Sequence, residues 1–259
     1  MASPEKTALV LSAGGMFGAY QAGAWRVLSD HVRPDIVTGA SVGALNGWPV
    51  AGGCTPQHLV ERWLDAATGE VLTVREDRGF GNGWSNHRWF DQAPLRAYAQ
   101  SLYDDYTPQV EFGLAIVKLP DLATQLVRHP HITAEHLVAT ASIPLVLPPV
   151  QIGGDRYVDG GLMEKMPIWA AIEMGATHIV AIDCLLVSNW WLRAGMGLFR
   201  RLKQKRQLPP DLSLILVAPE EPLGTWNDAV VWRPENIRRW IAMGERDAAR
   251  ALKAAAVIQ

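Results

Sequence analysis

DIVTGASVG, residues 35–43, joins a strand candidate to a serine flanked by glycines. Residues 35–38 form a buried-strand candidate, and an apolar run compatible with a helix follows the last glycine. Gly39-Ala40-Ser41-Val42-Gly43 fits the pattern G-x-S-x-G. A serine on a strained strand-to-helix turn projects its hydroxyl from the sheet edge, and the flanking glycines let backbone approach without Cβ clashes. The pattern predicts Ser41 as a nucleophile, with an ordinary glycine-rich turn as the alternative.

The residues upstream contain a second turn of the same kind. TALVLS (7–12) predicts a strand and residues 17–28 a helix, so SAGGMFG (12–18) joins them. A dinucleotide-binding turn needs G-x-G-x-x-G, but Ala13 takes the first glycine position, and a phosphate-binding Walker loop needs Gly-Lys-Ser/Thr. An oxyanion hole needs only backbone N–H donors near the nucleophile. Because adjacent parallel strands would bring this turn beside Ser41, the oxyanion hole is the favoured interpretation.

Ser41 needs a base, and the seven histidines do not provide one. After residue 159 only His178 remains, and it enters a strand candidate at 178–183, which is a poor position for a general base. Asp159 directly follows a strand candidate and begins the turn Asp159-Gly160-Gly161. A partly desolvated aspartate in this turn can accept the serine proton directly. The competing interpretation is a plain Asp-Gly turn.

Composition limits the fold and the ligands. A chain of 259 residues, 49% hydrophobic and 19% charged, suits one domain with a large core. The formal net charge of -2 favours no nucleic-acid partner, and the two cysteines, Cys54 and Cys184, favour neither a disulfide framework nor a metal site. The first apolar stretch breaks at Gly14 and Gly15, too early for a signal peptide or a membrane span. A cytoplasmic protein is therefore expected.

The remaining elements alternate along the chain. Further strands are expected at 112–117, 151–158, 178–183 and 214–217, and further helices at 134–141, 168–174 and 237–252. The polar, glycine-rich residues 75–87 predict an irregular loop able to cover a site. Residues 190–206 carry six Lys or Arg beside apolar residues near helical spacing. This segment is either a basic amphipathic helix that suits an anionic membrane surface or a partner groove, or a surface helix packed on the core.

Together the three turns resemble the patatin-like phospholipase family: a glycine-rich loop, then G-x-S-x-G, then D-G-G/A beyond a proline-rich strand. The resemblance covers residues 7–184, with further similar stretches at 20–24, 141–150 and 167–178. It implies a three-layer α/β/α sandwich with a mainly parallel central sheet. We expect one domain over 1–259, with a C-terminal helical segment at 190–259.

The resemblance also implies roles for individual residues. Ser41 and Asp159 form a catalytic dyad, and the amides of Gly14, Gly15 and Met16 form the oxyanion hole. No metal or organic cofactor is required.

Three residues depart from the family pattern. Ala13 replaces a glycine, Phe17 replaces a Lys or Arg, and Lys165 replaces an Asn. Loss of the cation at position 17 predicts a lower activity or a less anionic substrate. Lys165 leaves open how the Asp159 turn is anchored.

The implied function is hydrolysis of lipid acyl esters, as in a phospholipase A or a lysophospholipase, through an acyl-enzyme on Ser41. Two alternatives stay open: acyl transfer by the same dyad, and binding of lipid or membrane with little turnover. Membrane contact through 190–206 would place the protein peripherally at a membrane. Head group, acyl length and oligomeric state have no signature in the sequence.

Overall fold

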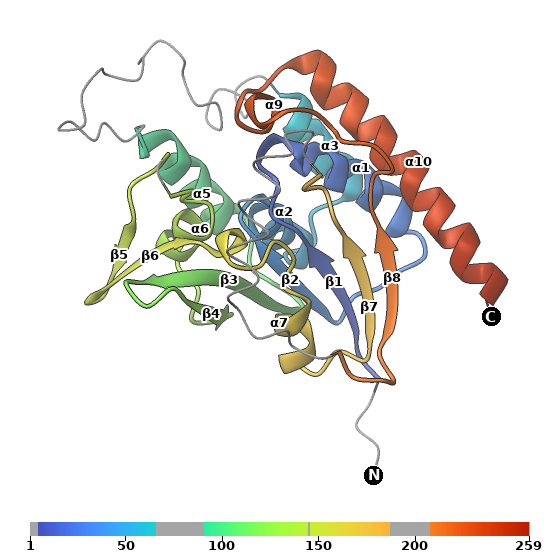
Figure 1. The fold of residues 1–259 in the computed structure, drawn as a ribbon, viewed down its shortest axis with the longest axis horizontal. Helices are drawn as coiled ribbons and strands as arrows, with labels where there is room; N and C mark the ends of the chain where they lie inside the picture. The colour runs from blue at the N-terminus through green and yellow to red at the C-terminus, as the bar shows by residue number, and fades with distance from the viewer. Residues whose placement is uncertain (1–4, 66–90, 145, 187–207, 259) are drawn as a thin grey trace.

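The centre of the fold is one mixed β-sheet (Figure 1). The computed structural model describes residues 5–65, 91–144, 146–186 and 208–258. Within them, eight strands pair in the order β5-β6-β3-β2-β1-β7-β8, and β4 pairs with β3 outside this path. The strands are β1 (Thr7–Leu11), β2 (Ile36–Ala40), β3 (Glu111–Leu119), β4 (Ala123–Arg128), β5 (Val150–Ile152), β6 (Asp155–Asp159), β7 (His178–Ile182) and β8 (Ser213–Val217).

Most of the sheet is parallel. Strands β3, β2, β1, β7 and β8 run in one direction, whereas β4, β5 and β6 pair antiparallel. Parallel strands are covered on both faces, which explains why β1 is an almost continuous apolar run. Every residue of β2 is buried, and in β1 only Thr7 is half-buried. The predicted α/β fold with a mainly parallel sheet is therefore confirmed.

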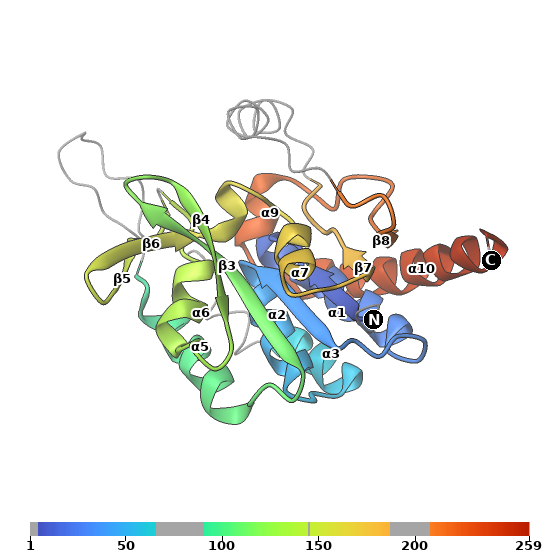
Figure 2. The ribbon, with the colours of Figure 1, turned by 90° about the horizontal axis from the view of Figure 1, so that it is seen from below.

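Helices cover both faces of the sheet (Figure 2). Leu9 and Leu11 of β1 face the large core under α1, α2, α3, α5 and α10. Ala8 and Val10 alternate to the other face, which α7 covers in the described part of the chain. The helices are α1 (Gly18–Leu28), α2 (Val42–Ala51), α3 (Pro56–Leu64), α5 (Ala93–Asp105), α6 (Ala134–Thr140), α7 (Ile168–Glu173), α9 (Trp226–Val230) and α10 (Pro234–Ile258), with 3-10 turns η1 (Gly15–Phe17) and η2 (Gly160–Leu162).

Helices α10 and α1 cross so closely that their backbones are in contact. A Cβ on Gly23 would stand 2.0 Å from a carbonyl oxygen of α10, and a Cβ on Gly244 would stand 2.1 Å from a carbonyl oxygen of α1. Phe17 packs edge-on against Trp240, with 4.9 Å between the ring centroids. This close crossing fixes the start of α1, and therefore the glycine-rich turn that precedes it.

The structure corrects two predicted elements. The strand expected at 151–158 is a hairpin, in which Gly153 and Gly154 separate β5 from β6. Gly153 has a φ of 60°, a conformation that glycine adopts readily and that reverses the chain here. The helix expected at 17–28 begins at Gly18, after the 3-10 turn η1.

Other elements were not predicted or lie outside the description. Strand β4 and helices α3, α5 and α9 had no counterpart in the sequence-based expectations. The loop expected at 75–87 and the basic segment 190–206 lie outside the described residues. Their roles stay predictions, as does the single domain over 1–259. The described part of 190–259 adds the edge strand β8 to the helices α9 and α10.

Candidate active site

Two strand ends meet head to head on one edge of β3. Strand β2 runs parallel to β3 and ends where Ala40 pairs with Ala115. Strand β6 runs antiparallel to β3 and ends where Asp159 pairs with Ile116, the next residue of β3. Strand β4 pairs along the opposite edge of this stretch. The sheet therefore brings Ser41, the residue after β2, beside Asp159.

Ser41 occupies a strained turn between β2 and α2. Its backbone has φ 54° and ψ -133°, a conformation that costs a non-glycine residue about 1–3 kcal/mol. A Cβ on Gly39 would stand 2.4 Å from the carbonyl oxygen of Gly43, and a Cβ on Gly43 would stand 2.3 Å from that of Leu11. The backbone approaches both positions too closely for any side chain, so both residues must be glycine, in agreement with the G-x-S-x-G spacing.

One short segment, residues 140–142, accepts hydrogen bonds from the backbone amides of both Ser41 and Asp159. The Thr140 hydroxyl accepts from the amide N–H of Ser41 at 3.0 Å and donates to a β3 carbonyl oxygen at 2.7 Å. Two residues later, the Ser142 carbonyl oxygen accepts from the amide N–H of Asp159 at 3.0 Å. Thr140 and Ser142 are fully buried. Because buried polar groups are costly to leave unpaired, these bonds hold the two strand ends at a fixed spacing.

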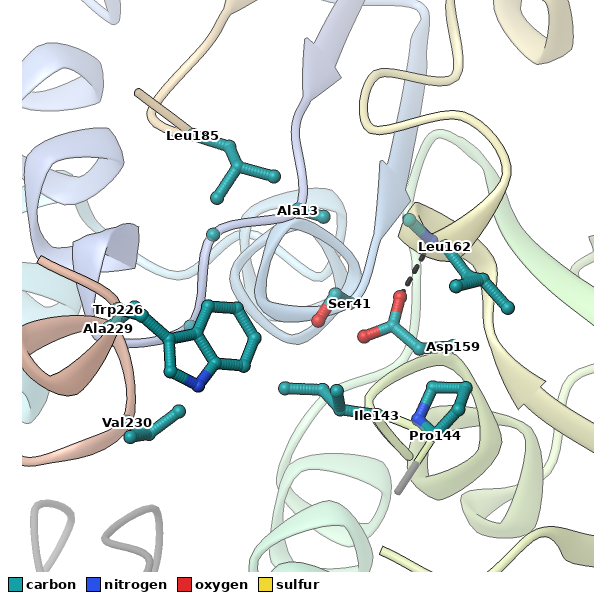
Figure 3. Close-up of a pocket in the computed structure, with 13 residues that line it drawn as sticks. Ala13, Ser41, Ile143, Pro144, Asp159, Leu162, Leu185, Trp226, Ala229 and Val230 are labelled. Atoms are coloured by element: carbon teal, nitrogen blue, oxygen red, sulfur yellow. Dashed lines mark hydrogen bonds between the residues drawn. The ribbon is translucent and has the colours of Figure 1, made fainter. Parts of the chain in front are cut away.

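The Asp159 carboxyl group points toward the Ser41 side chain (Figure 3). Its Oδ1 accepts from the Gly161 amide N–H at 2.6 Å. Burial raises the pKa of Asp159 to about 7, against the opposing effect of hydrogen bonds from Ser41 and from the Gly161 amide. A Cβ on Gly160 would stand 2.1 Å from the carbonyl oxygen of Ala115, so the turn needs glycine there. A base with a pKa near 7 is well matched to proton transfer at neutral pH.

The glycine-rich turn lies beside this pair. Gly14 and Gly15 line the same cavity as Ser41, and Gly15 has a φ of 56°. The amides of Gly14, Gly15 and Met16 have no hydrogen-bond partner among the residues that the structure describes. Met16 itself is only 2% exposed and its side chain belongs to the core. The free amides beside Ser41 can hold an oxyanion, so the oxyanion hole stays the prediction for this turn.

The cavity next to Ser41 is apolar. Its volume is about 220 Å³, and Ser41 and Asp159 lie in its wall. Figure 3 shows the Trp226 indole on the opposite side of Ser41 from Asp159. The large apolar side chains in its wall are those of Ile143, Pro144, Leu162, Leu185, Trp226 and Val230. A cavity of this composition fits a hydrocarbon chain.

A buried polar network lies behind both turns. Gln21 Nε2 donates to the carbonyl oxygen of Ser12 at 2.7 Å, and Gln21 Oε1 accepts from Asn46 Nδ2 at 2.9 Å. The Trp63 indole N–H donates to Asn46 Oδ1 at 3.0 Å. The network thus connects α1, α2 and α3 to the first residue of the glycine-rich turn. Sequence reasoning assigned no role to the side chains of Gln21 and Asn46. Each carries an amide side chain among apolar neighbours in the sequence, which is unusual because Asn and Gln are mostly exposed in folded proteins.

The structure shows what surrounds the three residues that depart from the family pattern. The Ala13 amide N–H donates to the Lys165 carbonyl oxygen at 2.6 Å, so the glycine-rich turn is bonded to the segment after Asp159. The Lys165 side chain forms an ion pair with Asp183, at the end of β7. Phe17 is fully buried in the core, where a cation would be unpaired and costly.

His178 begins β7, at the end of the sheet where β1 also begins, whereas Ser41 follows the other end of β2. The structure thus agrees that His178 is badly placed as a base. The described residues contain no group of three or more His, Cys, Asp or Glu arranged to hold a metal ion. None of the helices in the described ranges is both long and apolar enough to span a membrane.

Comparison with known proteins gives three findings. Residues 9–172 match the family model of patatin-like phospholipases. Lysophospholipase NTE1 of Debaryomyces hansenii is 22% identical over 185 residues, so 70% of this chain matches 12% of that protein. The crystal structure of VipD from Legionella pneumophila superposes with a TM-score of 0.55 at 12% identity, over 98% of this chain and 68% of that chain. At that identity the structural match supports the fold alone.

Proposed function

Because the chain belongs to the patatin-like phospholipase family, whose members are carboxylic-ester hydrolases, we propose that it hydrolyses acyl esters of lipids with Ser41 as nucleophile and Asp159 as base. The observation that carries the proposal is the meeting of β2 and β6 on β3, which sets a strained serine against a buried carboxylate in an apolar cavity. The family match includes both residues.

The first half of the reaction forms an acyl-enzyme. Asp159 accepts the proton of the Ser41 hydroxyl while the Ser41 oxygen attacks the ester carbonyl carbon. The amides of Gly14 and Gly15 donate hydrogen bonds to the oxyanion that develops, aided by the positive end of the α2 dipole. Collapse of this intermediate breaks the bond to the alcohol oxygen, which leaves with the proton from Asp159.

The second half releases the acid. A water molecule gives a proton to Asp159 and attacks the acyl carbonyl carbon, and the bond to the Ser41 oxygen breaks as the serine recovers the proton. The pKa of Asp159, raised to about 7 by burial, supports both directions of proton transfer at neutral pH. The apolar cavity supports a hydrocarbon acyl group as the part of the substrate that is bound there.

The proposal is tested by turnover of p-nitrophenyl esters of increasing acyl length. We expect the wild type to be active, and Ser41→Ala and Asp159→Asn each to lower kcat/KM by roughly 10³-fold or more while remaining folded. Matched controls on α5, Ser101→Ala and Asp104→Asn, should keep the wild-type rate. Labelling by a fluorophosphonate should occur in the wild type and be lost in Ser41→Ala.

Each failure has a separate meaning. An inert wild type would contradict hydrolysis, and an active Asp159→Asn variant would contradict the dyad. Product analysis with an added alcohol separates hydrolysis from acyl transfer, because transfer yields a new ester in place of the free acid.

A further inference from the structure

The cavity has two walls that come from different parts of the chain. The dyad, the glycine-rich turn, Ile143 and Pro144 all fall within residues 9–172, the range that matches the family model. Trp226 and Val230 come from α9, well beyond that range. Figure 3 shows Trp226 and Val230 on one side of Ser41 and Ile143, and Pro144 on the other. The proposed catalytic groups and the wall that faces them thus come from separate segments of the chain, with Leu185 lying between these segments in the sequence.

Helix α9 touches the glycine-rich turn directly. A Cβ on Gly15 would stand 2.1 Å from the carbonyl oxygen of Ala229, and Ala229 is 4% exposed. The helix therefore rests on the backbone beside the candidate oxyanion hole, and the side chains on its cavity face stand at a fixed distance from Ser41.

Polar contacts also hold α9 to the residues on either side of it in the sequence. The Thr225 amide and hydroxyl donate to Asp228 Oδ2 at 2.9 Å and 2.8 Å, which caps the start of the helix. Asp228 Oδ1 accepts from Arg233 at 2.8 Å and from Asn236 at 3.3 Å, and these two residues flank and begin α10. The Trp240 indole N–H donates to the carbonyl oxygen of Leu223 at 2.9 Å. These bonds tie α9 to the long helix that packs against α1.

We propose that α9 sets the acyl-chain length that the enzyme accepts, with Trp226 and Val230 as the specificity-determining residues. This inference rests on the proposed function. Each methylene that enters the cavity adds roughly fourfold to kcat/KM, which is ~0.8 kcal/mol. The gain ends where the chain meets the Trp226 ring, because further methylenes stay in water or force the ring to move.

The test compares p-nitrophenyl esters from acetate to hexadecanoate. Trp226→Ala should raise the ratio of kcat/KM for dodecanoate over acetate by roughly 15- to 60-fold, the effect of about two to three more buried methylenes. Val230→Phe fills part of the same cavity and should lower this ratio. Asn227→Ala changes an exposed residue of the same helix and should leave the ratio unchanged.

A binding assay keeps this inference separate from the proposed function. In the Ser41→Ala background, calorimetry with saturated fatty acids of four to sixteen carbons should show the tightest-binding length moving longer with Trp226→Ala and shorter with Val230→Phe. If the wild type is inert but the two variants change the fatty-acid length that binds most tightly, hydrolysis is contradicted and the role of α9 in chain-length selection is supported. If neither variant moves the preferred length in either assay, while thermal melts show both to be folded, the role of α9 is refuted.

Discussion

Replacing Asp159 by Asn should stabilise the folded protein at neutral and alkaline pH while removing turnover. Burial raises the pKa of Asp159 from 3.8 to about 7. Between these two pH values the folded state binds a proton that the unfolded state has released, so the free energy of unfolding falls as pH rises. The whole loss amounts to about 4 kcal/mol above pH 7. Asparagine has no charge to bury, and its amide oxygen can still accept from the Gly161 amide.

The assay is urea unfolding of wild type and Asp159→Asn between pH 4 and pH 8.5, with Asp104→Asn as the control for an exposed carboxylate. The two proteins should have similar free energies of unfolding near pH 4. The difference in favour of the variant should grow up to about pH 7 and stay constant at higher pH. The control should show no such trend. A variant less stable than wild type at pH 8, or a difference that does not depend on pH, would show that the carboxylate is not destabilised by burial.

Three further predictions concern the same site. kcat/KM should rise with pH and level off above about pH 7, because the buried base must be ionised, and a flat profile from pH 5.5 to 8 measured by pH-stat would count against it. Thr140→Val leaves the Ser41 amide without its acceptor, so stability should fall by about 1–3 kcal/mol and kcat should fall at unchanged KM, with Thr140→Ser restoring both in steady-state and melting assays. Gly15→Ala should destabilise far more than Gly153→Ala in thermal melts, because both have positive φ but only a Cβ on Gly15 would strike Ala229; equal melting temperatures would refute this.

The fold was predictable where the signals are local and strong. The buried runs at β1, β2 and β7 are apolar on both faces, so their strand character follows from composition. The hairpin of β5 and β6 was missed because its two short strands were read as one, although the Gly153-Gly154 pair marks a reversal. Strand β4 was missed because its residues are mostly half-buried at the edge of β3 and carry no clear alternation.

In the candidate site, too, local sequence patterns predicted some features and long-range contacts determine the others. Gly39, Gly43 and Gly160 belong to local patterns, so the positions of both turns could be expected from spacing alone. The supporting bonds could not, because Thr140 reaches the Ser41 amide across a sequence separation of 99 residues. Nothing near Trp226 in the sequence indicates that it lines a cavity with Ser41, since contacts distant along the chain, of α9 with Gly15 and of α10 with α1, bring it there. The dyad itself stays a prediction until turnover is measured.

The head-to-head junction on β3 has a consequence for synthesis of the protein. Ser41 leaves the ribosome long before the strand that carries Asp159, and neither β2 nor β6 can orient the residue at its end until β3 lies alongside both. Pairing of this kind depends on contacts distant along the chain and forms late in folding. Nascent, truncated or partly folded chains therefore lack the assembled pair of Ser41 and Asp159, and the proposed activity should arise only in molecules whose central sheet is complete.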